Sequence, residues 1–498
     1  MKPQVVRLAR AAGPQLARIP GPKSVKTWQY TATAATAGLA LAASVVTAAG
    51  PWDSTGQRTA ERDRAAAREH TGGADHDGES GTSGGVPRAA PSAASVLAGL
   101  GGTSNTVTAA PTGQGLSTTL DPLLKDAALG PRRTAAVVDV ATGKRLYGTG
   151  AGKALTPAST TKIATAVAAL SALGADHRLT TRAVLEPDTR ELVLVGGGDP
   201  TITAHQDTEG WASLRTLAAD TAAALKKRDI RAVTLSYDAT LYAGPELHPI
   251  GVNDNLAPVT ALMADEARTD DSTSGPVPRV PDPQADATRK FAAFLKDHGI
   301  TATTPGPARA TARAQSLATV TSPPLSALVE RMLTNSDNDI AEALARQTAV
   351  ATGERADFDG AGRAIAAQLR KLRLPLSGAA FHDGSGLDRD DRLTADLLTS
   401  LLVEAGDPSH PGLRPVLTGL PVAGFTGTLT SRYTNGAAGL VRAKTGTLTG
   451  VNTLAGTVVD QDGRLLAFAF LTSQTTDPVA AQAALDRTAT ALAACGCR

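Results

Sequence analysis

The sequence has few aromatic residues and almost no charge imbalance. Phe, Trp and Tyr make up 3% of its 498 residues, and the formal net charge at pH 7 is +2. A surface that stacks on bases or neutralises a phosphate backbone needs more of both, so we expect no nucleic-acid partner. The chain is nevertheless long enough for two or three domains with sizeable cores.

Cysteine is almost absent as well. The two cysteines, Cys495 and Cys497, stand in the terminal Cys-Gly-Cys-Arg. They cannot supply a disulfide framework or a four-ligand zinc site. We interpret the segment as a frayed tail, with a terminal redox role as the alternative. The eight histidines show no paired metal-ligand spacing, so we expect neither a metal nor a cofactor.

The N-terminal segment is typical of an exported protein. Residues 1–26 carry six Lys or Arg and no Asp or Glu, and residues 27–49 then run without a charge. An apolar run of this length can span a bilayer as a helix, with the basic flank kept as a cytoplasmic tail. A signal peptide cleaved near Ala48 and Ala49 is the alternative. Either interpretation places the rest of the chain outside the cytoplasmic membrane, and we favour the anchored one slightly.

Composition divides the rest of the chain. Residues 50–115 lack the large apolar side chains that offset ordering entropy, so we expect a disordered linker. Residues 116–177 and 316–498 have the helix and strand patterns of one domain, and residues 178–315 differ enough to indicate a smaller inserted domain. In the insertion, Gly196-Gly-Gly-Asp-Pro200 lacks the helix context and the lysine of a phosphate loop, so it is not interpreted as a nucleotide site.

The first motif with chemistry is Ser159-Thr-Thr-Lys162. It follows Pro157 at the expected start of a helix, and the three-residue spacing places Lys162 on the same face as Ser159. A serine hydroxyl needs an adjacent base to attack at neutral pH. A lysine can be that base when burial or a nearby positive charge lowers its pKa, and we expect Lys444 to supply such a charge. Alone, the motif also fits a capped helix with a solvated lysine.

A second motif, Ser336-Asp-Asn338, lies between two expected helices. Its serine hydroxyl can relay a proton to a leaving amine. Its Asn amide can hold a substrate carbonyl and support Lys162. Because Ser, Asp and Asn are also the preferred helix caps, capping is the alternative explanation of this polar cluster.

The third motif, Lys444-Thr-Gly446, ends an expected strand. Lys444 and Thr445 can bind a substrate carboxylate, and an extended peptide can add to the strand with main-chain bonds from Thr447. Gly446 leaves room for that approach. The N–H groups of Ser159 and Thr447 would form an oxyanion hole. On its own, the motif also fits a β-turn.

The three motifs in this order resemble the active-site set of penicillin-binding proteins and serine β-lactamases. Further segments are similar to one family in particular, the class C low-molecular-mass penicillin-binding proteins, which are D-alanyl-D-alanine carboxypeptidase/endopeptidases. These segments are Gly197-Gly-Asp-Pro-Thr201, Ala257-Pro-Val-Thr-Ala-Leu262, Asp383-Gly-Ser-Gly-Leu387 and Lys444-Thr-Gly-Thr-Leu-Thr-Gly450. The resemblance covers residues 116 to about 490. It implies an α/β transpeptidase-like fold, with an antiparallel sheet flanked by helices, an all-helical part and an inserted smaller α/β domain.

The resemblance also assigns roles residue by residue. It makes Ser159 the acylated nucleophile and Lys162 its base, with the second and third motifs completing the site as described above. Asp254 matches an acidic residue that recognises the free amine of the peptidoglycan diamino acid, and Leu448 would line the same pocket. The short segment from Asp265 to Pro283 stands where relatives often carry a third domain, so we expect none here.

The sequence therefore predicts a serine-type D-Ala-D-Ala carboxypeptidase that trims peptidoglycan stem peptides and is acylated by β-lactam antibiotics. DD-endopeptidase activity is left open. Ser385 with His382 is a second, weaker candidate for a nucleophile and its base. The alternatives to a carboxypeptidase are a β-lactamase or esterase on the same fold, and a catalytically silent wall-binding protein.

Overall fold

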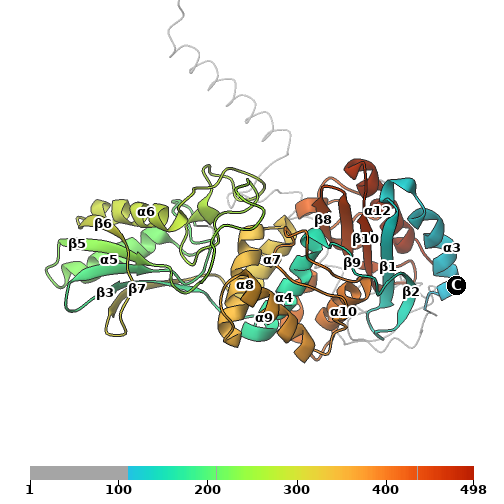
Figure 1. Ribbon diagram of the computed structural model, residues 1–498, viewed down its shortest axis with the longest axis horizontal. Helices are drawn as coiled ribbons and strands as arrows, with labels where there is room; N and C mark the ends of the chain where they lie inside the picture. The colour runs from blue at the N-terminus through green and yellow to red at the C-terminus, as the bar shows by residue number, and fades with distance from the viewer. Residues whose placement is uncertain (1–109, 209, 434–435, 498) are drawn as a thin grey trace, which may run out of the picture. The chain divides into compact units, whose positions relative to one another are not determined.

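The computed structural model describes residues 110–208, 210–433 and 436–497. The described residues belong to one compact unit, which is built on two five-stranded sheets (Figure 1). Among the described residues, none of the helices combines the length and the apolar character that crossing a membrane requires. The predicted cytoplasmic tail, the membrane or signal segment 27–49 and the linker as far as residue 109 lie outside the described residues and stay predictions.

The first sheet is antiparallel throughout, with the strand order β2-β1-β10-β9-β8. Strands from both ends of the described chain therefore meet in one sheet, and β8 lies at its edge. The strands are β1 (Arg132–Asp139), β2 (Arg145–Thr149), β8 (Val441–Leu448), β9 (Val451–Val459) and β10 (Leu465–Ser473). β9 and β10 are buried along almost their whole length because helices cover both faces of the sheet.

The two faces of this sheet carry side chains of different size. On one face, Phe468 and Phe470 pack against α3 (Gly113–Leu124) and α12 (Pro478–Ala493). On the other face, small residues such as Ala467 and Ala469 pack against α10 (Ala395–Gly406), and α4 (Thr161–Leu173) contributes to the same apolar cluster. Successive strand residues point to opposite faces, so this alternation lets α10 approach the sheet closely.

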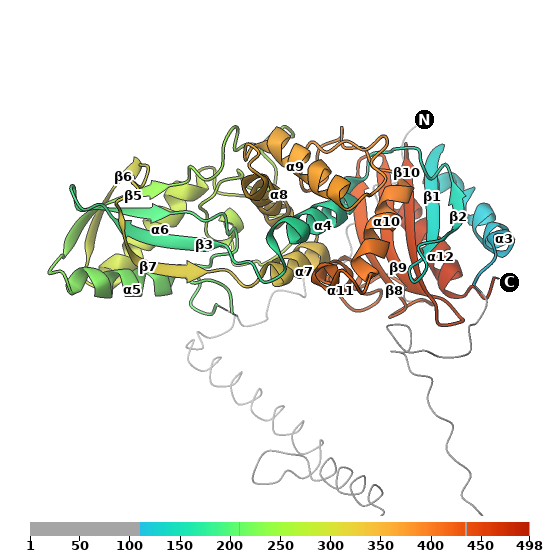
Figure 2. The same ribbon diagram turned by 90° about the horizontal axis from the view of Figure 1, so that it is seen from below.

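α4 is the central helix of the all-helical part, and Figure 2 shows it among α7, α8, α9 and α10. Residues 161–170 of α4 are all buried, as expected for a helix surrounded by others. The neighbouring helices are α7 (Leu325–Asn335), α8 (Asn338–Thr352), α9 (Phe358–Lys371) and α11 (Pro415–Thr418). Short 3-10 turns complete the described helices: η2 (Ala127–Leu129), η3 (Ala158–Thr160), η4 (Asp265–Ala267), η5 (Pro411–Leu413) and η6 (Gly427–Leu429).

The second sheet is mixed and has the order β6-β5-β4-β3-β7. β3 pairs antiparallel with β4 and β7, whereas β4, β5 and β6 run parallel. Helices α5 and α6 pack on one face through one apolar cluster. The elements are β3 (Thr180–Leu185), β4 (Glu191–Val195), α5 (Leu214–Lys226), β5 (Ala232–Asp238), α6 (Pro283–Asp297), β6 (Thr301–Pro307) and β7 (Gln315–Thr321). The predicted fold class, with a smaller α/β part inserted between the first two motifs, is confirmed.

The long connection between β5 and α6 leaves the second sheet and packs on the helical part. Tyr242, Leu256 and Val259 share an apolar cluster with residues of α8 and α9. The pairing of β7 with β3 keeps residues 315–321 in the second sheet. The predicted domain boundaries, residues 178–315 for the insertion and 116–177 with 316–498 for the main domain, stay a prediction.

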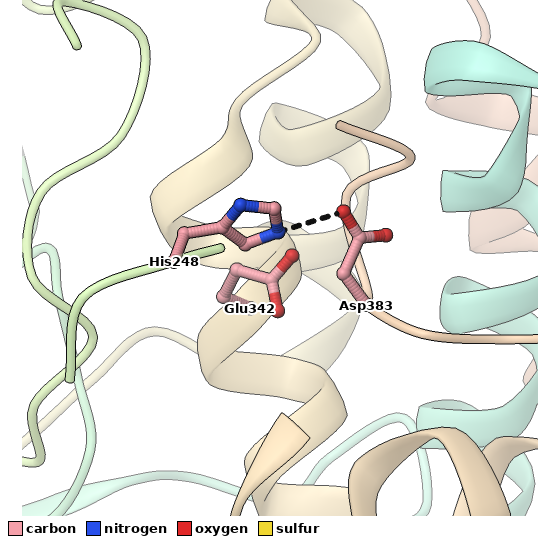
Figure 3. Close-up of side chains that lie close together, drawn as sticks. All are labelled: His248, Glu342 and Asp383. Atoms are coloured by element: carbon pink, nitrogen blue, oxygen red, sulfur yellow. Dashed lines mark hydrogen bonds and ion pairs between the residues drawn. The ribbon is translucent and has the colours of Figure 1, made fainter. Parts of the chain in front are cut away.

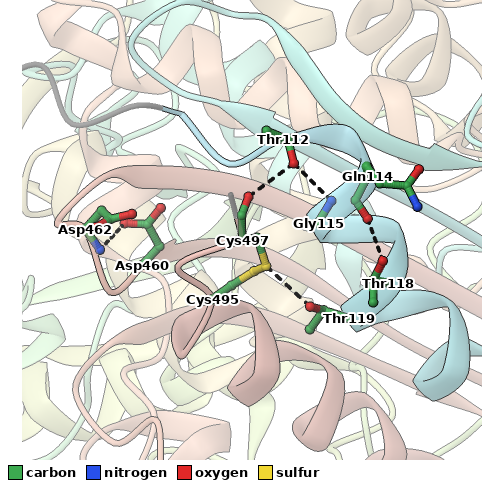
Figure 4. Close-up of a disulfide and its surroundings, with 9 residues drawn as sticks. All are labelled: Thr112, Gln114, Gly115, Thr118, Thr119, Asp460, Asp462, Cys495 and Cys497. Carbon is green, nitrogen blue, oxygen red and sulfur yellow. Dashed lines mark hydrogen bonds between the residues drawn. A yellow bond between two sulfur atoms is a disulfide. The ribbon is translucent and has the colours of Figure 1, made fainter.

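The C-terminal tail is packed rather than frayed, as Figure 4 shows. Cys495 is 3% exposed, and a disulfide joins it to Cys497. The N–H of Thr112 donates to the carbonyl of Cys497 over 2.7 Å, and the Cys497 sulfur lies 3.4 Å from the hydroxyl of Thr119. The interpretation of this segment as a frayed tail was wrong. Its partners, Thr112 and Thr119, are nearly the whole domain away in sequence, so the local composition gives no signal of these contacts.

Candidate active site

A tight turn at the start of α4 positions Ser159 and Lys162. Ser159 lies in η3 and Lys162 in the first turn of α4. Ala158, immediately before the serine, has a φ of 48°, in the left-handed region that residues with a side chain rarely adopt. Backbone strain of this kind persists where the surrounding structure holds it in place. The resulting geometry leaves Nζ of Lys162 3.2 Å from Oγ of Ser159.

Lys162 is completely buried, and its contacts are with neutral oxygens. Besides Ser159, Nζ donates to Oδ1 of Asn338 over 2.6 Å and to the carbonyl of Ser385 over 2.7 Å. Burial lowers the pKa of Lys162 to about 8, against the opposing effect of nearby carboxylates, of which Asp383 is the strongest. An amine with such a pKa is partly neutral near physiological pH, as a general base must be.

The second motif joins α7 to α8. Ser336 ends α7 in the left-handed conformation, with a φ of 59°. The helix cap itself is made by Asp337, whose carboxylate accepts the N–H of Ile340 over 2.9 Å. The capping alternative is therefore correct for the side chain of Asp337, while Ser336 caps α7 through its backbone only. Ser336 and Asn338 are left to contact the two lysines.

Lys444 lies in β8 and is as deeply buried as Lys162. Its Nζ donates to Oγ of Ser336 over 2.8 Å and to the carbonyl of Thr445 over 2.8 Å. Burial, followed by the charges of Lys162 and Arg432, lowers the pKa of Lys444 well below its usual value. We expected burial or the charge of Lys444 to depress the pKa of Lys162. Burial is the cause that lowers the pKa of Lys162, and the repulsion between the two lysines lowers that of Lys444 instead.

The rest of the third motif follows the edge strand β8. Thr445 is partly buried, and its hydroxyl donates to Oγ1 of Thr428 over 3.1 Å. Thr447 is exposed, and Leu448 ends the strand, half-buried. The first half of β8 is bridged on its outer side, where Val422 pairs with Arg442. Among the described residues, no strand pairs with the outer side of the second half, next to the buried Lys444, which is the geometry that strand addition of a peptide requires.

Gly446 is required by the protein's own packing. A Cβ there would lie 2.8 Å from the carbonyl oxygen of Pro157 and would overlap the hydroxyl of Thr453. We had attributed this glycine to room for a docked peptide. The close approach is instead that of the segment before Ser159, so Gly446 fixes the distance between the first and third motifs.

Replacing Gly446 should therefore destabilise the fold. We expect Gly446→Ala to lower the free energy of unfolding by about 1–3 kcal/mol, because the added methyl group forces backbone atoms apart. Gly412→Ala is the matched control, since a Cβ there meets nothing within 4 Å. Thermal unfolding of both variants checks this, and equal melting temperatures would contradict the packing role.

The predicted specificity residues lie near the site. Asp254 is exposed in the connection between β5 and α6. The next residue, Asn255, accepts a hydrogen bond from Nδ2 of Asn338 over 2.8 Å, which places this loop beside the second motif. A pocket shared by Asp254 and Leu448 stays a prediction.

The structure does not favour Ser385 as a nucleophile. Ser385 is fully buried, and its hydroxyl donates to Asp383 over 3.1 Å. The described contact of His382 is through its main-chain N–H, which donates to Asp391 over 2.7 Å. The contribution of Ser385 is its main-chain carbonyl on Lys162, which sequence reasoning missed. Every residue has a main-chain carbonyl, so the sequence does not mark this one, although the Asp383-Gly-Ser-Gly segment that contains it was recognised.

Two groups of buried side chains have the composition of a metal site. One is His248, Glu342 and Asp383, and the other is Glu266, Asp337 and Asp339. In the first group the ligand atoms already accept protein hydrogen bonds. In the second, Arg268, Arg279 and Arg331 lie against the carboxylates and match their charge. The chemistry of neither donor set calls for a cation, and the expected absence of metal stays a prediction.

The glycine-rich segment after β4 is also explained by packing. A Cβ at Gly197 would overlap the backbone of Thr180, and one at Gly196 the backbone of Ala261. Both glycines line a cavity of about 1120 Å³ beside β3 and β4. None of the predicted site residues lines this cavity, so we do not identify it with the active site.

The chain is similar to known proteins along most of its length. It matches the model of the D-Ala-D-Ala carboxypeptidase 3 (S13) family over residues 116–275 and 269–492. It is 37% identical over 402 residues to carboxypeptidase DacB of Mycolicibacterium smegmatis, covering 78% of this chain and 85% of that one. A carboxypeptidase of Mycobacterium tuberculosis is 35% identical over 427 residues, which cover 83% of this chain and 90% of that one.

A solved structure has the same fold. The crystal structure of penicillin-binding protein 4 from Haemophilus influenzae superposes with a TM-score of 0.61, over 75% of this chain and 97% of that one. The sequence identity is 20%, so this likeness concerns the fold alone. The family match and the sequence relatives confirm the predicted resemblance to class C low-molecular-mass penicillin-binding proteins. The chain belongs to the D-Ala-D-Ala carboxypeptidase 3 (S13) family.

Proposed function

We propose that this chain is a serine-type D-Ala-D-Ala carboxypeptidase in which Ser159 is acylated and Lys162 is its base. The observation that carries the proposal is the buried amine of Lys162, 3.2 Å from the serine hydroxyl. Lys162 is also in contact with Asn338, while Lys444 is in contact with Ser336. All three motifs thus converge on one place, and family membership supports the reaction proposed for it.

The reaction proceeds in two acyl-transfer steps. Lys162 takes the proton of Ser159 Oγ as that oxygen attacks the carbonyl carbon between the two D-Ala residues. Ser336, which accepts a hydrogen bond from Lys444, relays the proton taken up by Lys162 to the amine as D-Ala leaves. Water then attacks the acyl-enzyme and gives one proton to the neutral Lys162, which returns it to the Ser159 oxygen as the acyl group leaves. The N–H groups of Ser159 and Thr447 would stabilise the oxyanion in both steps.

Substrate binding follows from the edge strand and its lysine. The stem peptide would lie along β8, with its terminal carboxylate near Lys444 and Thr445. Asp254 and Leu448 would contact the diamino acid side chain, with the carboxylate pairing its free amine. β-Lactams carry a carboxylate next to a strained amide, so they would occupy the same subsites and acylate the same serine.

We further propose that the protein acts outside the cytoplasmic membrane, where peptidoglycan stem peptides are found. The family and its cell-wall substrate support extracytoplasmic action. Anchoring through residues 27–49, or secretion to the cell wall after cleavage, rests on the sequence pattern alone. Release of the protein from membranes by salt or carbonate alone would count against an anchor.

The pH dependence of acylation follows from the pKa of Lys162. Because the base must be neutral and burial lowers its pKa to about 8, we expect the acylation rate to rise with pH along a limb centred near that value. An exposed lysine would place the limb near 10.4. Stopped-flow acylation by benzylpenicillin across this range measures the limb, and a rate that is flat above pH 6 would contradict an unprotonated Lys162 as base.

Two assays separate the proposal from its alternatives. Release of D-Ala from a pentapeptide ending in D-Ala-D-Ala identifies the carboxypeptidase, and cleavage of a cross-linked dimer identifies an additional endopeptidase. Steady hydrolysis of benzylpenicillin without D-Ala release would instead identify a β-lactamase or esterase. A folded protein that cleaves neither the peptides nor benzylpenicillin, and that forms no adduct with the drug, would be a silent wall-binding protein.

A further inference from the structure

Three buried side chains that the proposed mechanism does not use lie together behind the catalytic lysine. Figure 3 shows His248, from the connection between β5 and α6, with Glu342 of α8 and Asp383. The side chains of His248 and Asp383 are 1% and 0% exposed, and Glu342 is also fully buried. Burial of two carboxylates this close together is costly unless hydrogen bonds compensate it, so their partners indicate what the cluster does.

Both carboxylates accept hydrogen bonds from main-chain N–H groups of one turn. Glu342 accepts the N–H of Gly384 over 3.0 Å and that of Ser385 over 2.8 Å. Asp383 accepts the N–H of Gly386 over 2.6 Å and that of Asp388 over 2.7 Å. The turn from residue 383 to 388 is therefore folded around two buried carboxylates. Burial raises the pKa of Glu342 to about 7, so its negative charge is present at the pH where Lys162 titrates, near 8.

This turn holds the base. The carbonyl of Ser385, between the two sets of hydrogen bonds, accepts from Nζ of Lys162 over 2.7 Å. Gly386 has a φ of 81°, and a Cβ there would overlap the carbonyl oxygen of Ala158, next to the nucleophile. Glu342 also stands four residues after Asn338, on the same face of α8. Two of the three contacts of Lys162 thus depend on the segment around Glu342.

His248 attaches the loop of residues 246–256 to the same turn. Its Nε2 lies 3.1 Å from Oδ2 of Asp383, and its Nδ1 accepts the N–H of Ile250 over 3.2 Å. Nδ1 is therefore unprotonated, and the proton is on Nε2, where it is donated to Asp383. The ring also packs edge-on against Phe358, with centroids 5.1 Å apart. The other end of the loop is held by the bond from Asn338 to Asn255.

We propose that Glu342, Asp383 and His248 are positioning residues that hold the Ser385 carbonyl against Lys162 and tie the substrate-facing loop 246–256 to the catalytic base. The cluster acts through the turn and touches neither substrate nor the reacting atoms. This inference rests on the proposed role of Lys162. It gives each of the three residues a function that a core-packing role would not require.

The charge of Glu342 supplies a readout that packing alone would not move. The carboxylates that face Lys162 are Asp383 in the turn, Glu342 and Asp339 on α8, and Asp337 before it. Lys444 faces it from β8. Each of these carboxylates raises the pKa of Lys162 against the effect of burial, so loss of one charge should lower that pKa further.

The test is the isosteric variant Glu342→Gln. Its amide oxygen can still accept from the turn, but the negative charge is gone. We expect the pH limb of acylation by benzylpenicillin to move to lower pH by about half a unit or more. Glu186→Gln is the matched control, because Glu186 is also buried and accepts a loop N–H, that of Thr311, over 2.7 Å, yet is not among the charges that act on Lys162. It should leave the limb in place.

A second pair of variants tests His248. His248→Phe keeps a ring against Phe358 but removes the donor to Asp383, and we expect acylation to slow by about 10-fold or more. His248→Gln retains a donor and should recover part of that loss. If both variants acylate at the wild-type rate, His248 has no positioning role.

The unsubstituted protein gives a measurement that does not depend on a variant folding. Hydrogen exchange of the amides of Gly384, Ser385 and Gly386 should be as slow as exchange in α4, since each donates to a buried carboxylate. Exchange within seconds would overturn the proposal. If benzylpenicillin does not acylate the wild-type protein, the proposed function itself is rejected. If the wild type is acylated and Glu342→Gln shows the same dependence of the acylation rate on pH, this inference alone is rejected.

Discussion

Ser159→Ala will release no measurable D-Ala from a pentapeptide substrate, with a loss of about 10⁴-fold or more in turnover. The variant lacks the oxygen that forms the acyl-enzyme, and the buried Lys162 has no other hydroxyl among its described hydrogen-bond partners. The substitution removes one atom from a turn held by its backbone, so the fold should be retained. Coupled assay of free D-Ala measures the loss.

Ser385→Ala is the matched control for that experiment. Ser385 is buried, and its hydroxyl donates to Asp383 rather than facing the site. This variant removes one hydrogen bond to the positioning residue Asp383 but keeps the main-chain carbonyl that contacts Lys162, so it should lose far less activity than Ser159→Ala. Turnover by Ser159→Ala at the wild-type rate, or its loss only in Ser385→Ala, would move the nucleophile away from the first motif.

Lys162→Met will acylate about 10²-fold to 10⁴-fold more slowly than wild type, the range that a general base contributes. Methionine fills a similar volume without an amine, so Ser159 loses its base while the packing of α4 is kept. Asn338 and the Ser385 carbonyl lose a donor at the same time. Stopped-flow acylation by benzylpenicillin measures the rate.

The pH profile of this variant makes the test specific. This variant lacks the amine whose pKa is lowered by burial to about 8. The rise of the acylation rate with pH near that value should therefore disappear. Lys153→Met, at an exposed lysine just before the motif, is the control and should keep both rate and limb. An unchanged acylation rate in Lys162→Met would show that another group deprotonates the serine.

The fold class and the three motifs could be predicted because their signals are local. The spacing of Ser159 and Lys162 is that of one helical turn, and the structure joins the two side chains directly. The antiparallel sheet was implied by the family resemblance, and the apolar strand patterns at both ends of the domain did not give its pairing. Membership of the family was predictable because several separate segments carried its signatures in order.

The remaining features depend on contacts between distant segments. Glu342 and His248 stand 41 and 135 residues from Asp383, and neither belongs to a recognisable motif. Burial was one of the two causes that we named for a low pKa of Lys162, but the helices that bury this side chain come from distant parts of the sequence. Gly446 was assigned to the substrate for a similar reason, since its real neighbour, Pro157, is far away in sequence.

The most direct test of the account is the mass of the protein after incubation with benzylpenicillin, followed by mapping of the modified peptide. We predict a single lasting adduct, located on Ser159 and absent from Ser159→Ala. The same preparation should release D-Ala from the pentapeptide until the drug is added. An adduct on another residue, or an unmodified folded protein with the drug intact, would contradict the assignment of Ser159 as the nucleophile.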